Sequence, residues 1–315
     1  MNSTPFSTTL ITPSDTALPA SGGDSHDRAL VLGGGGSTGN AWLIGVIAGL
    51  FDAAVDVTNA DVIIGTSAGS TATAQITGAA LPRLFEETLA PVPLARSAPR
   101  RPASTSTRTA DHLGRFRTLI DASQGPADMR RKMGAAALQM AAATDSSWQS
   151  QWRATVAARL PDVEWPHQPV LLTAIDAESG DPVVFNRHSG IEFVDAVAAS
   201  CSSGLPYKIG DRHYLDGGFR RSSENADLAA GYSRVLVLSP LDGRSLQPPE
   251  WGMQLATQVE ELSATGSLVE IIMPNAEEEH LFGVNAMDLS MRPDAAQAGY
   301  EQGKVLARRV SDFWG

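Results

Sequence analysis

The sequence has one cysteine, Cys201, in 315 residues, so the chain cannot form an internal disulfide. A single free thiol suits a reducing compartment, although it does not prove one. The sequence also lacks the roughly 20-residue apolar run that a membrane-spanning helix needs. Its start lacks the basic and apolar segments of a signal peptide. These absences predict a cytoplasmic protein.

Positive charge is also scarce, because 24 Lys and Arg residues face 35 Asp and Glu residues, giving a formal net charge of −11. Nucleic-acid phosphates bind to basic surfaces, so this balance argues against a nucleic-acid partner. It also disfavours broad adsorption to anionic membranes, although a local basic patch leaves room for transient contact with a membrane surface. Hydrophobic residues at 43% and charged residues at 19% are ordinary for a globular protein.

The beginning of the chain divides into a polar tail and a folded part. Residues 1–27 are rich in Ser, Thr, Pro and Gly, which predicts a disordered N-terminal tail. The predicted folded domain covers 28–315, which is long enough to bury a large core. Short apolar strands at 29–32 and 62–64 are each followed by a glycine-rich turn and a small-residue helix. This alternation is typical of α/β proteins with a mainly parallel sheet.

The middle of the chain predicts a flexible flap and a helical cap, together covering about 90–160. Pro, Arg, Ser and Thr dominate 90–109, which favours a surface loop. Helical stretches over 127–143 and 148–160 carry Met and Trp residues, whose spacing favours a core role over lipid contact. Further strands are predicted over 170–175, 182–185, 212–215, 235–238 and 268–273, and further helices over 193–200, 250–264 and 293–313.

The segment 65–69, Gly-Thr-Ser-Ala-Gly, fits the G-x-S-x-G pattern of a nucleophile elbow. In that arrangement Ser67 sits on a strained turn between a strand and a helix, and small residues at Gly65 and Gly69 let the two approach closely. The helix N-terminus then offers N–H groups and a positive dipole to a developing oxyanion. The alternative is a serine and glycine turn without chemistry.

A second glycine-rich turn, Gly-Gly-Gly-Gly-Ser-Thr-Gly at 33–39, also lies between a strand and a helix. Its unobstructed N–H groups favour an anion-binding nest, which beside a nucleophile is an oxyanion hole. Gly34, Gly36 and Gly39 also fit the dinucleotide fingerprint, so a nucleotide-binding protein is the main alternative. That alternative needs an acidic residue at the end of the second strand, where this chain has Gly65-Thr66-Ser67 instead.

Asp216-Gly217-Gly218 follows a predicted strand and presents a carboxylate with open space around it. Such an aspartate can accept a serine proton directly, although Asp-Gly is also common in hairpin turns. A histidine base would be expected in an α/β-hydrolase triad, and His280 is the one placed suitably downstream. It follows three glutamates in a segment that reads as exposed. His213 is close enough in sequence to influence Asp216.

Together these three motifs resemble the patatin-like phospholipases. That family joins a glycine-rich loop, a G-x-S-x-G serine and a distant D-G-G or D-G-A aspartate, in this order. The segment 199–206, Ala-Ser-Cys-Ser-Ser-Gly-Leu-Pro, is also similar to the family's segment before the aspartate. The resemblance covers about 28–240 and implies a three-layer α/β/α fold with a mainly parallel central sheet, here a patatin-like acyl hydrolase domain.

The resemblance implies a catalytic dyad in which Asp216 takes the proton from Ser67. The N–H groups of Gly34, Gly35 and Gly36, with Ala68, are the implied oxyanion hole, supported by Gly39, Gly65, Gly69, Gly217 and Gly218. The expected substrate is a lipid or another acyl ester, cleaved through an acyl-enzyme without a metal or other cofactor. One departure is Thr38, which stands where the family usually has a basic residue, and this weakens the expectation of phospholipid specificity.

Three other readings use the same residues. Acyl transfer to an acceptor other than water needs the same dyad. A nucleotide-binding α/β protein would use the glycine-rich loop without hydrolysis. A catalytically inactive scaffold would retain Ser67 and Asp216 as remnants, and their presence counts against it. The sequence leaves the acyl-chain preference and the oligomeric state open.

Overall fold

The computed structural model describes residues 27–90, 105–145 and 147–315. In the helix that follows residues 91–104, side chains are described from residue 113 onward. The tail predicted over 1–27 lies outside the described residues except for its last residue. Most of the flap predicted over 90–109 also lies outside them. Within the described residues, no helix combines the length and apolar character that crossing a membrane requires.

Eight strands in the described part of the chain form one mixed sheet, in the order β5-β6-β3-β2-β1-β7-β8, with β4 paired to β3. The pairs among β3, β2, β1, β7 and β8 are parallel, whereas β4, β5 and β6 pair antiparallel. The strands are β1 (Arg28–Leu32), β2 (Val62–Gly65), β3 (Val170–Asp176), β4 (Pro182–Phe185), β5 (Tyr207–Ile209), β6 (Arg212–Asp216), β7 (Arg234–Leu238) and β8 (Leu268–Ile272).

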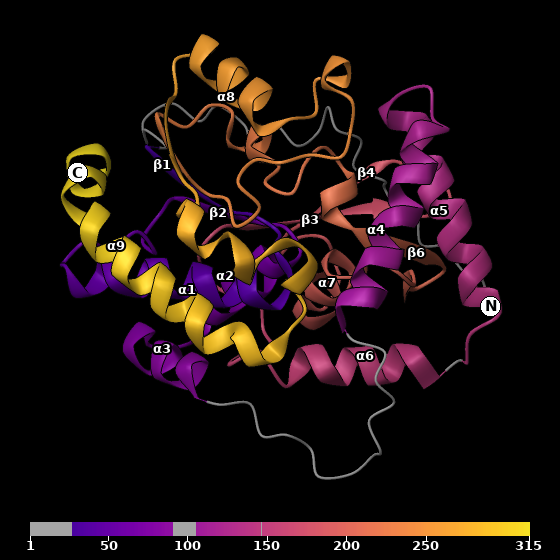
Figure 1. Ribbon diagram of the computed structural model, residues 1–315, viewed down its shortest axis with the longest axis horizontal. Helices are drawn as coiled ribbons and strands as arrows, with labels where there is room; N and C mark the ends of the chain where they lie inside the picture. Colours follow the sequence, from indigo (N-terminus) through magenta and orange to yellow (C-terminus); the bar gives the residue numbers. More distant parts are fainter. Residues whose placement is uncertain (1–26, 91–104, 146) are drawn as a thin grey trace, which may run out of the picture.

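Helices cover both faces of this sheet (Figure 1), so the predicted layered α/β class is confirmed. The helices are α1 (Gly36–Asp52), α2 (Ala68–Gly78), α3 (Leu81–Leu89), α4 (Thr105–Asp121), α5 (Pro126–Ala142), α6 (Ser147–Ala157), α7 (Phe193–Ser200), α8 (Leu255–Ala264) and α9 (Arg292–Trp314). The helices α1, α2, α7 and α9 contribute to the largest core cluster, on one face. The helices α8 and α5 pack on the opposite face.

The central strands are apolar throughout because both of their faces are buried. In β1, Leu30 and Leu32 belong to the core cluster under α1 and α9, whereas Ala29 and Val31 belong to the cluster under α8. All four side chains are fully inaccessible to solvent. The short, continuous apolar runs in the sequence therefore predicted the parallel core correctly.

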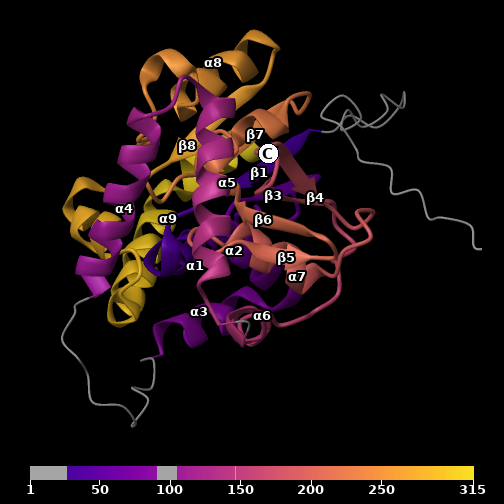
Figure 2. The same ribbon diagram turned by 90° about the vertical axis from the view of Figure 1, so that its right-hand side faces the viewer.

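The helices α1 and α9 lie side by side in both views (Figures 1 and 2), although they are far apart in sequence. Glycines on both helices allow this approach. A methyl group added at Gly49 would lie 2.1 Å from the carbonyl oxygen of Tyr300, and one added at Gly299 would lie 2.4 Å from that of Trp42. The helix α1 begins in the glycine-rich loop, so this packing fixes the helix that follows the loop.

The cap region differs from its prediction. The helix α4 begins at Thr105, so the loop predicted to extend through 109 is wrong in its last part. The signal for this helix was a helical repeat of Leu113, Phe116 and Ile120, which the Ser, Thr and Arg content obscured. Figure 2 shows α4 beside α5. Met129 and Met133 of α5 are buried in the core, as their spacing predicted.

Three smaller differences concern element boundaries. The helix predicted over 250–264 begins only at Leu255, because a short 3-10 turn (Pro249–Trp251) ends at Gly252, whose φ of +62° interrupts a helix. The short strand β5 and the helix α3 were not predicted. The remaining predicted strands and helices are confirmed with ends shifted by a few residues.

Candidate active site

Ser67 lies on the sharp turn between β2 and α2. Its backbone has φ +53° and ψ −115°, a region that favours glycine, so the residue is held under strain. Two contacts from the end of α7 fix this turn. The Ser67 N–H donates to Ser200 Oγ at 3.0 Å, and the Cys201 thiol donates to the Ser67 carbonyl at 3.0 Å. The predicted serine therefore occupies an elbow that the surrounding structure holds in place.

Close packing around the elbow depends on its two glycines. A methyl group added at Gly69 would lie 1.8 Å from the Leu32 carbonyl oxygen, inside the end of β1. One added at Gly65 would lie 2.8 Å from Ser70 Cα. Neither separation is compatible with a side chain, so these positions let α2 start directly against the sheet.

Asp216 is the last residue of β6, and only 7% of it is exposed. Its carboxylate accepts a hydrogen bond from the Gly218 N–H at 2.8 Å and also interacts with the Ser67 side chain. Burial raises the pKa of Asp216 to about 6, although these two hydrogen bonds oppose the rise. Gly217 and Gly218 continue into a 3-10 turn (Gly217–Phe219), so Asp216 does not sit in a hairpin turn.

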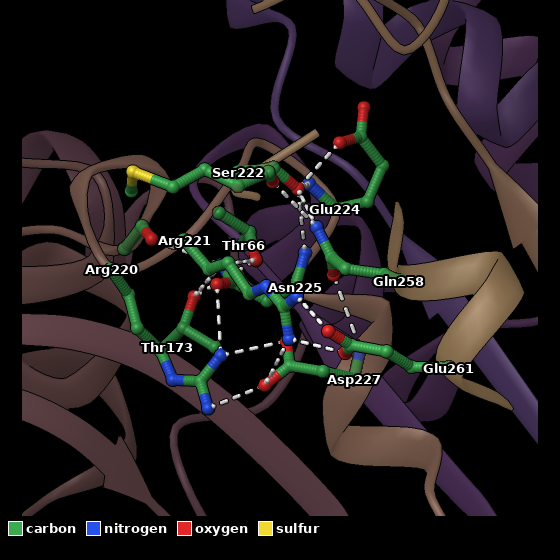
Figure 3. Close-up of polar contacts among 12 residues, drawn as sticks. Thr66, Thr173, Arg220, Arg221, Ser222, Glu224, Asn225, Asp227, Gln258 and Glu261 are labelled. Carbon is green, nitrogen blue, oxygen red and sulfur yellow. Dashed lines mark hydrogen bonds and ion pairs between the residues drawn. The ribbon is translucent and has the colours of Figure 1, made fainter. Parts of the chain in front are cut away.

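A buried amide links the two halves of the site, as Figure 3 shows. The Nδ2 of Asn225 donates to Thr66 Oγ1 at 3.0 Å and to the Gly217 carbonyl at 2.9 Å. It also lies 3.3 Å from Thr173 Oγ1 on β3, the strand between β2 and β6. Thr66 directly precedes the serine and Gly217 directly follows the aspartate. The Asn225 side chain therefore fixes the residues next to Ser67 and Asp216, a role that the sequence did not reveal.

The segment after the aspartate is anchored by ionic and hydroxyl contacts (Figure 3). Arg220 forms two hydrogen bonds of 2.9 Å to the Asp227 carboxylate. The fully buried Glu224 accepts hydrogen bonds from Ser222, at 2.7 Å, and from Ser239, at 2.7 Å. These contacts hold the segment against the neighbouring parts of the site.

The glycine-rich loop lies against the serine. A methyl group added at Gly34 would lie 3.4 Å from Ser67 Cβ, so the loop lies close against Ser67. The predicted oxyanion role of Gly34 needs correction, because its N–H donates to the Ser223 carbonyl at 2.8 Å. Among the described residues, the N–H groups of Gly35, Gly36 and Ala68 have no such partner. These three remain the candidate donors to an oxyanion.

Arg292 supplies a positive charge to the glycine-rich loop, in which Thr38 stands where a basic residue was expected. Thr38 is fully buried, and its Oγ1 has no hydrogen-bond partner among the described residues. Arg292 instead reaches the loop from α9, donating to the Ser37 carbonyl at 2.7 Å and to Asn40 Oδ1 at 3.2 Å. A cation is therefore present beside the glycine-rich loop, supplied from 255 positions further along the chain. Sequence spacing carried no signal for it.

Ser67 and Asp216 open into a cavity of about 620 Å³. The side chains from the cap and the adjacent 3-10 turn that line it are mainly apolar: Leu113, Phe116, Ile120, Met133, Trp152 and Phe219. Three further apolar residues line it and remain exposed, Leu246 at 39%, Met287 at 51% and Leu289 at 44%. The cavity therefore combines a serine hydroxyl, a carboxylate and an apolar wall.

None of the described histidine side chains lines this cavity. His213 pairs through Nδ1 with Glu178 at 2.6 Å, and His280 contacts the Glu277 carbonyl at 3.0 Å. Both groups face other parts of the protein. The carboxylate beside the Ser67 side chain is that of Asp216, and this arrangement suits serine attack with a carboxylate base.

The sequence matches the family described as patatin-like phospholipase over residues 30–230. No curated protein matches it. Among solved structures, the chain is similar to VipD from Legionella pneumophila, with 11% identity and a TM-score of 0.40, covering 91% of this chain and 67% of VipD. It is also similar to the type III effector protein ExoU, with 18% identity and a TM-score of 0.39, covering 90% of this chain and 53% of ExoU.

Proposed function

We propose that this chain, which belongs to the patatin-like phospholipase family, is a serine acyl hydrolase that cleaves carboxylic esters of lipids. Family membership implies a lipid acyl hydrolase. One observation carries the assignment to particular residues, namely the buried Asp216 carboxylate interacting with the Ser67 side chain at the floor of an apolar cavity. The cytoplasmic location stays a prediction.

In the first half of the reaction, the Asp216 carboxylate accepts the proton of the Ser67 hydroxyl while Oγ attacks the ester carbonyl carbon. Negative charge moves onto the carbonyl oxygen. We expect the N–H groups of Gly35, Gly36 and Ala68, which have no backbone acceptor among the described residues, to stabilise it, aided by the dipole at the start of α2. Collapse of this intermediate breaks the ester C–O bond, and the leaving alcohol takes the proton from Asp216.

In the second half, Asp216 accepts a proton from a water molecule, whose oxygen attacks the acyl-enzyme carbonyl. The second intermediate collapses to a free carboxylic acid, and the proton on Asp216 returns to Ser67 Oγ. Asp216 must be ionised at the start of each half. Because burial raises its pKa to about 6, we expect kcat/KM to fall as the pH drops below that value.

The cavity wall supports an acyl chain as the group on the carbonyl side. Phe116, Ile120 and Met133 come from α4 and α5, and Phe219 lies three residues after the catalytic base. Removing apolar surface from water contributes about 25 cal/mol per Å². Each additional methylene that the wall covers should therefore improve kcat/KM until the cavity is full.

The direct test is hydrolysis of p-nitrophenyl esters from butyrate to palmitate by wild type, Ser67→Ala and Asp216→Ala. We expect turnover by wild type and rates at background for Ser67→Ala. Loss of a general base typically costs about 10²–10⁴ in rate, so Asp216→Ala should fall by that factor. Circular dichroism should show that both variants remain folded. Activity retained by Asp216→Ala would contradict the dyad, and an inert wild type would favour an inactive scaffold.

The exposed apolar rim of the cavity supports transient contact with a lipid surface. Met287 and Leu289 are 51% and 44% exposed and also line the cavity, so a lipid held there would remain partly in its bilayer. Met287→Asp should reduce hydrolysis of phosphatidylcholine vesicles more than hydrolysis of p-nitrophenyl butyrate. The matched control is Val305→Asp, at an 81% exposed position outside the cavity lining. Equal losses with both substrates would exclude a role for the rim in surface contact.

A further inference from the structure

A second cavity, of about 390 Å³, lies outside the candidate active site, and none of the described residues lines both. Its charged lining consists of three guanidinium groups and two carboxylates, those of Arg130, Arg220, Arg221, Asp227 and Glu261. Two of these arginines belong to the segment after Asp216, whose neighbouring residues Phe219 and Ser222 line the active-site cavity. The two cavities therefore adjoin the same short segment, and the second carries one positive charge in excess.

Four of these five charged groups pair with one another. Arg220 donates two hydrogen bonds of 2.9 Å to the Asp227 carboxylate (Figure 3). Arg221 donates two hydrogen bonds of 2.7 Å to the Glu261 carboxylate. It also lies 3.9 Å from Asp227, so the two pairs are in contact. Each carboxylate is already engaged by a guanidinium, and the excess charge is therefore that of Arg130.

Arg130 extends from α5 and contacts only neutral acceptors. Its Nε donates to the Gly180 carbonyl at 2.8 Å, and its Nη1 donates to the Arg220 carbonyl at 3.1 Å. Nη2 has no acceptor in the part of the chain that the structure describes. Burial and the charge of Arg220 lower the pKa of Arg130, whereas the exposed Asp181 attracts this guanidinium without forming an ion pair. A partly buried cation thus faces a cavity that holds no anion to neutralise it.

The charge excess and the unused donors both favour a carboxylate as the group that this cavity binds. A carboxylate carries one negative charge, which equals the excess, whereas a phosphate dianion would leave the cavity negative. On Arg130, Nη2 keeps both of its N–H groups and Nη1 keeps one, and such a planar fork matches the two oxygens of a carboxylate. Pro126, Pro182 and Trp251 line the same cavity and offer apolar surface to the remainder of a ligand.

We propose that this cavity binds the carboxylate group of a small organic acid, with Arg130 pairing with the carboxylate and Trp251 covering the hydrocarbon part. The inference does not depend on the proposed hydrolysis, although that reaction would release compounds of this class. The site also adjoins the contacts that hold the active site. Arg130 binds the Arg220 carbonyl, and Arg220 Nη1 donates to Asn225 Oδ1 at 3.1 Å.

The experiment measures the dissociation constant for sodium butyrate by titration calorimetry, with ionic strength held constant by sodium chloride. We expect Arg130→Gln to raise this constant at least about tenfold, as for loss of a charge-assisted bidentate pair. Arg130→Lys keeps the charge but loses the planar fork, so it should raise the constant less, and it tests the site should Arg130→Gln fail to fold. The matched control is Arg131→Gln, which removes the adjacent exposed arginine outside the cavity lining and should leave the constant unchanged.

Glu261→Gln should have the opposite effect. The Glu261 side chain is 52% exposed, so its replacement is compatible with folding, and it frees Arg221 for the ligand. We expect the dissociation constant for butyrate to fall roughly threefold or more, because one repulsive charge is gone. Neither Arg130 nor Glu261 lines the active-site cavity, so these two opposite shifts distinguish the second cavity from butyrate bound as a product beside Ser67.

Sodium phosphate is titrated in parallel to test the choice of ligand. Weaker binding of phosphate than of butyrate supports the charge argument, and tighter Arg130-dependent binding of phosphate would contradict a carboxylate site. Absence of butyrate binding, or butyrate binding that is the same in wild type, Arg130→Gln, Arg130→Lys and Glu261→Gln, would overturn the proposal. Ester hydrolysis is not measured in this experiment, so either result leaves the proposed hydrolase function to its own test.

Discussion

Ser67 and Asp216, the proposed nucleophile and base, lie at the ends of β2 and β6, two strands separated by β3, and the two ends differ in what makes them unfavourable. At Ser67 the backbone is strained, with φ +53°, while the side chain is a neutral hydroxyl. At Asp216 the backbone is extended, with φ −46° and ψ 136°, and a carboxylate is buried instead. The proposed nucleophile is thus held by a strained backbone, and the proposed base carries a desolvated carboxylate.

The two ends share one structural device, which is the close approach of glycine backbone to a neighbouring strand. Gly69 contacts the end of β1, and Gly217 contacts Thr173 on β3. The Asn225 amide then fixes both ends relative to each other through Thr66 and Gly217. The strained backbone at Ser67 and the buried carboxylate at Asp216 are therefore held by one network of contacts. Substitutions that change only one of these two features should separate their effects.

The largest expected effect comes from filling the space beside the base. A methyl group at Gly217 would lie 2.0 Å from Thr173 Oγ1, so Gly217→Ala must push Asp216 away from Ser67. We expect a loss of about 3 kcal/mol or more in the free energy of unfolding and loss of esterase activity. Urea unfolding and p-nitrophenyl butyrate turnover measure the two effects. The adjacent Gly218→Ala is the control, because its methyl group would meet only Asp216 Oδ1, at 3.2 Å. Equal tolerance of both substitutions would contradict the close packing.

A comparable effect, of opposite sign, is expected from removing the buried charge. Burial raises the pKa of Asp216 from 3.8 to about 6 in the folded protein. The contribution of Asp216 to the free energy of unfolding is therefore fully present below pH 3.8 and is lost as the pH rises through 6, because the folded protein then buries a charged carboxylate. Asp216→Asn removes this cost and should stabilise the protein by roughly 3 kcal/mol at pH 8, with little effect at pH 4. Urea unfolding at both pH values checks this. The exposed Asp211→Asn serves as control, and a pH-independent difference for Asp216→Asn would contradict burial as the cause.

The smallest expected effect comes from relieving the backbone strain at the other end. At φ +53° glycine is favoured over alanine, so Ser67→Gly should be more stable than Ser67→Ala by about 1 kcal/mol. The same pair at Ser150, an exposed residue inside α6, should show the reverse order, because glycine weakens an ordinary helix. Thermal unfolding of the four variants gives the comparison. The same order at both positions would show that the elbow is not strained.

The sequence predicted those features that depend on local patterns. Apolar runs identified the central strands, and glycine spacing identified the turns that carry Ser67 and the glycine-rich loop. The structure also brings Asp216 to Ser67, although 149 positions separate them, because both lie at the ends of strands of one sheet. Family resemblance, rather than spacing, was the reason to pair them.

The features that were missed depend on contacts between distant segments. The bond of Asn225 to Thr66 joins positions 159 apart, and that of Arg292 to Ser37 joins positions 255 apart. No local pattern distinguishes these residues from other asparagines and arginines. The hydrogen bond from the Gly34 N–H to the Ser223 carbonyl could not be predicted either, because the glycines of the loop are equivalent in the sequence. For α4, an apolar repeat was present but was outweighed by polar composition.

The most direct test of the dyad is covalent labelling of the protein with a fluorophosphonate, read by intact mass and peptide sequencing. Ser67 Oγ should attack phosphorus and displace fluoride, giving one phosphonyl adduct per chain, located on the peptide that contains Ser67. Asp216→Asn should label at least about 10²-fold more slowly, because the serine has lost its base. Labelling that persists in Ser67→Ala, or an unlabelled wild type that nevertheless hydrolyses esters, would contradict the assignment of Ser67 as nucleophile.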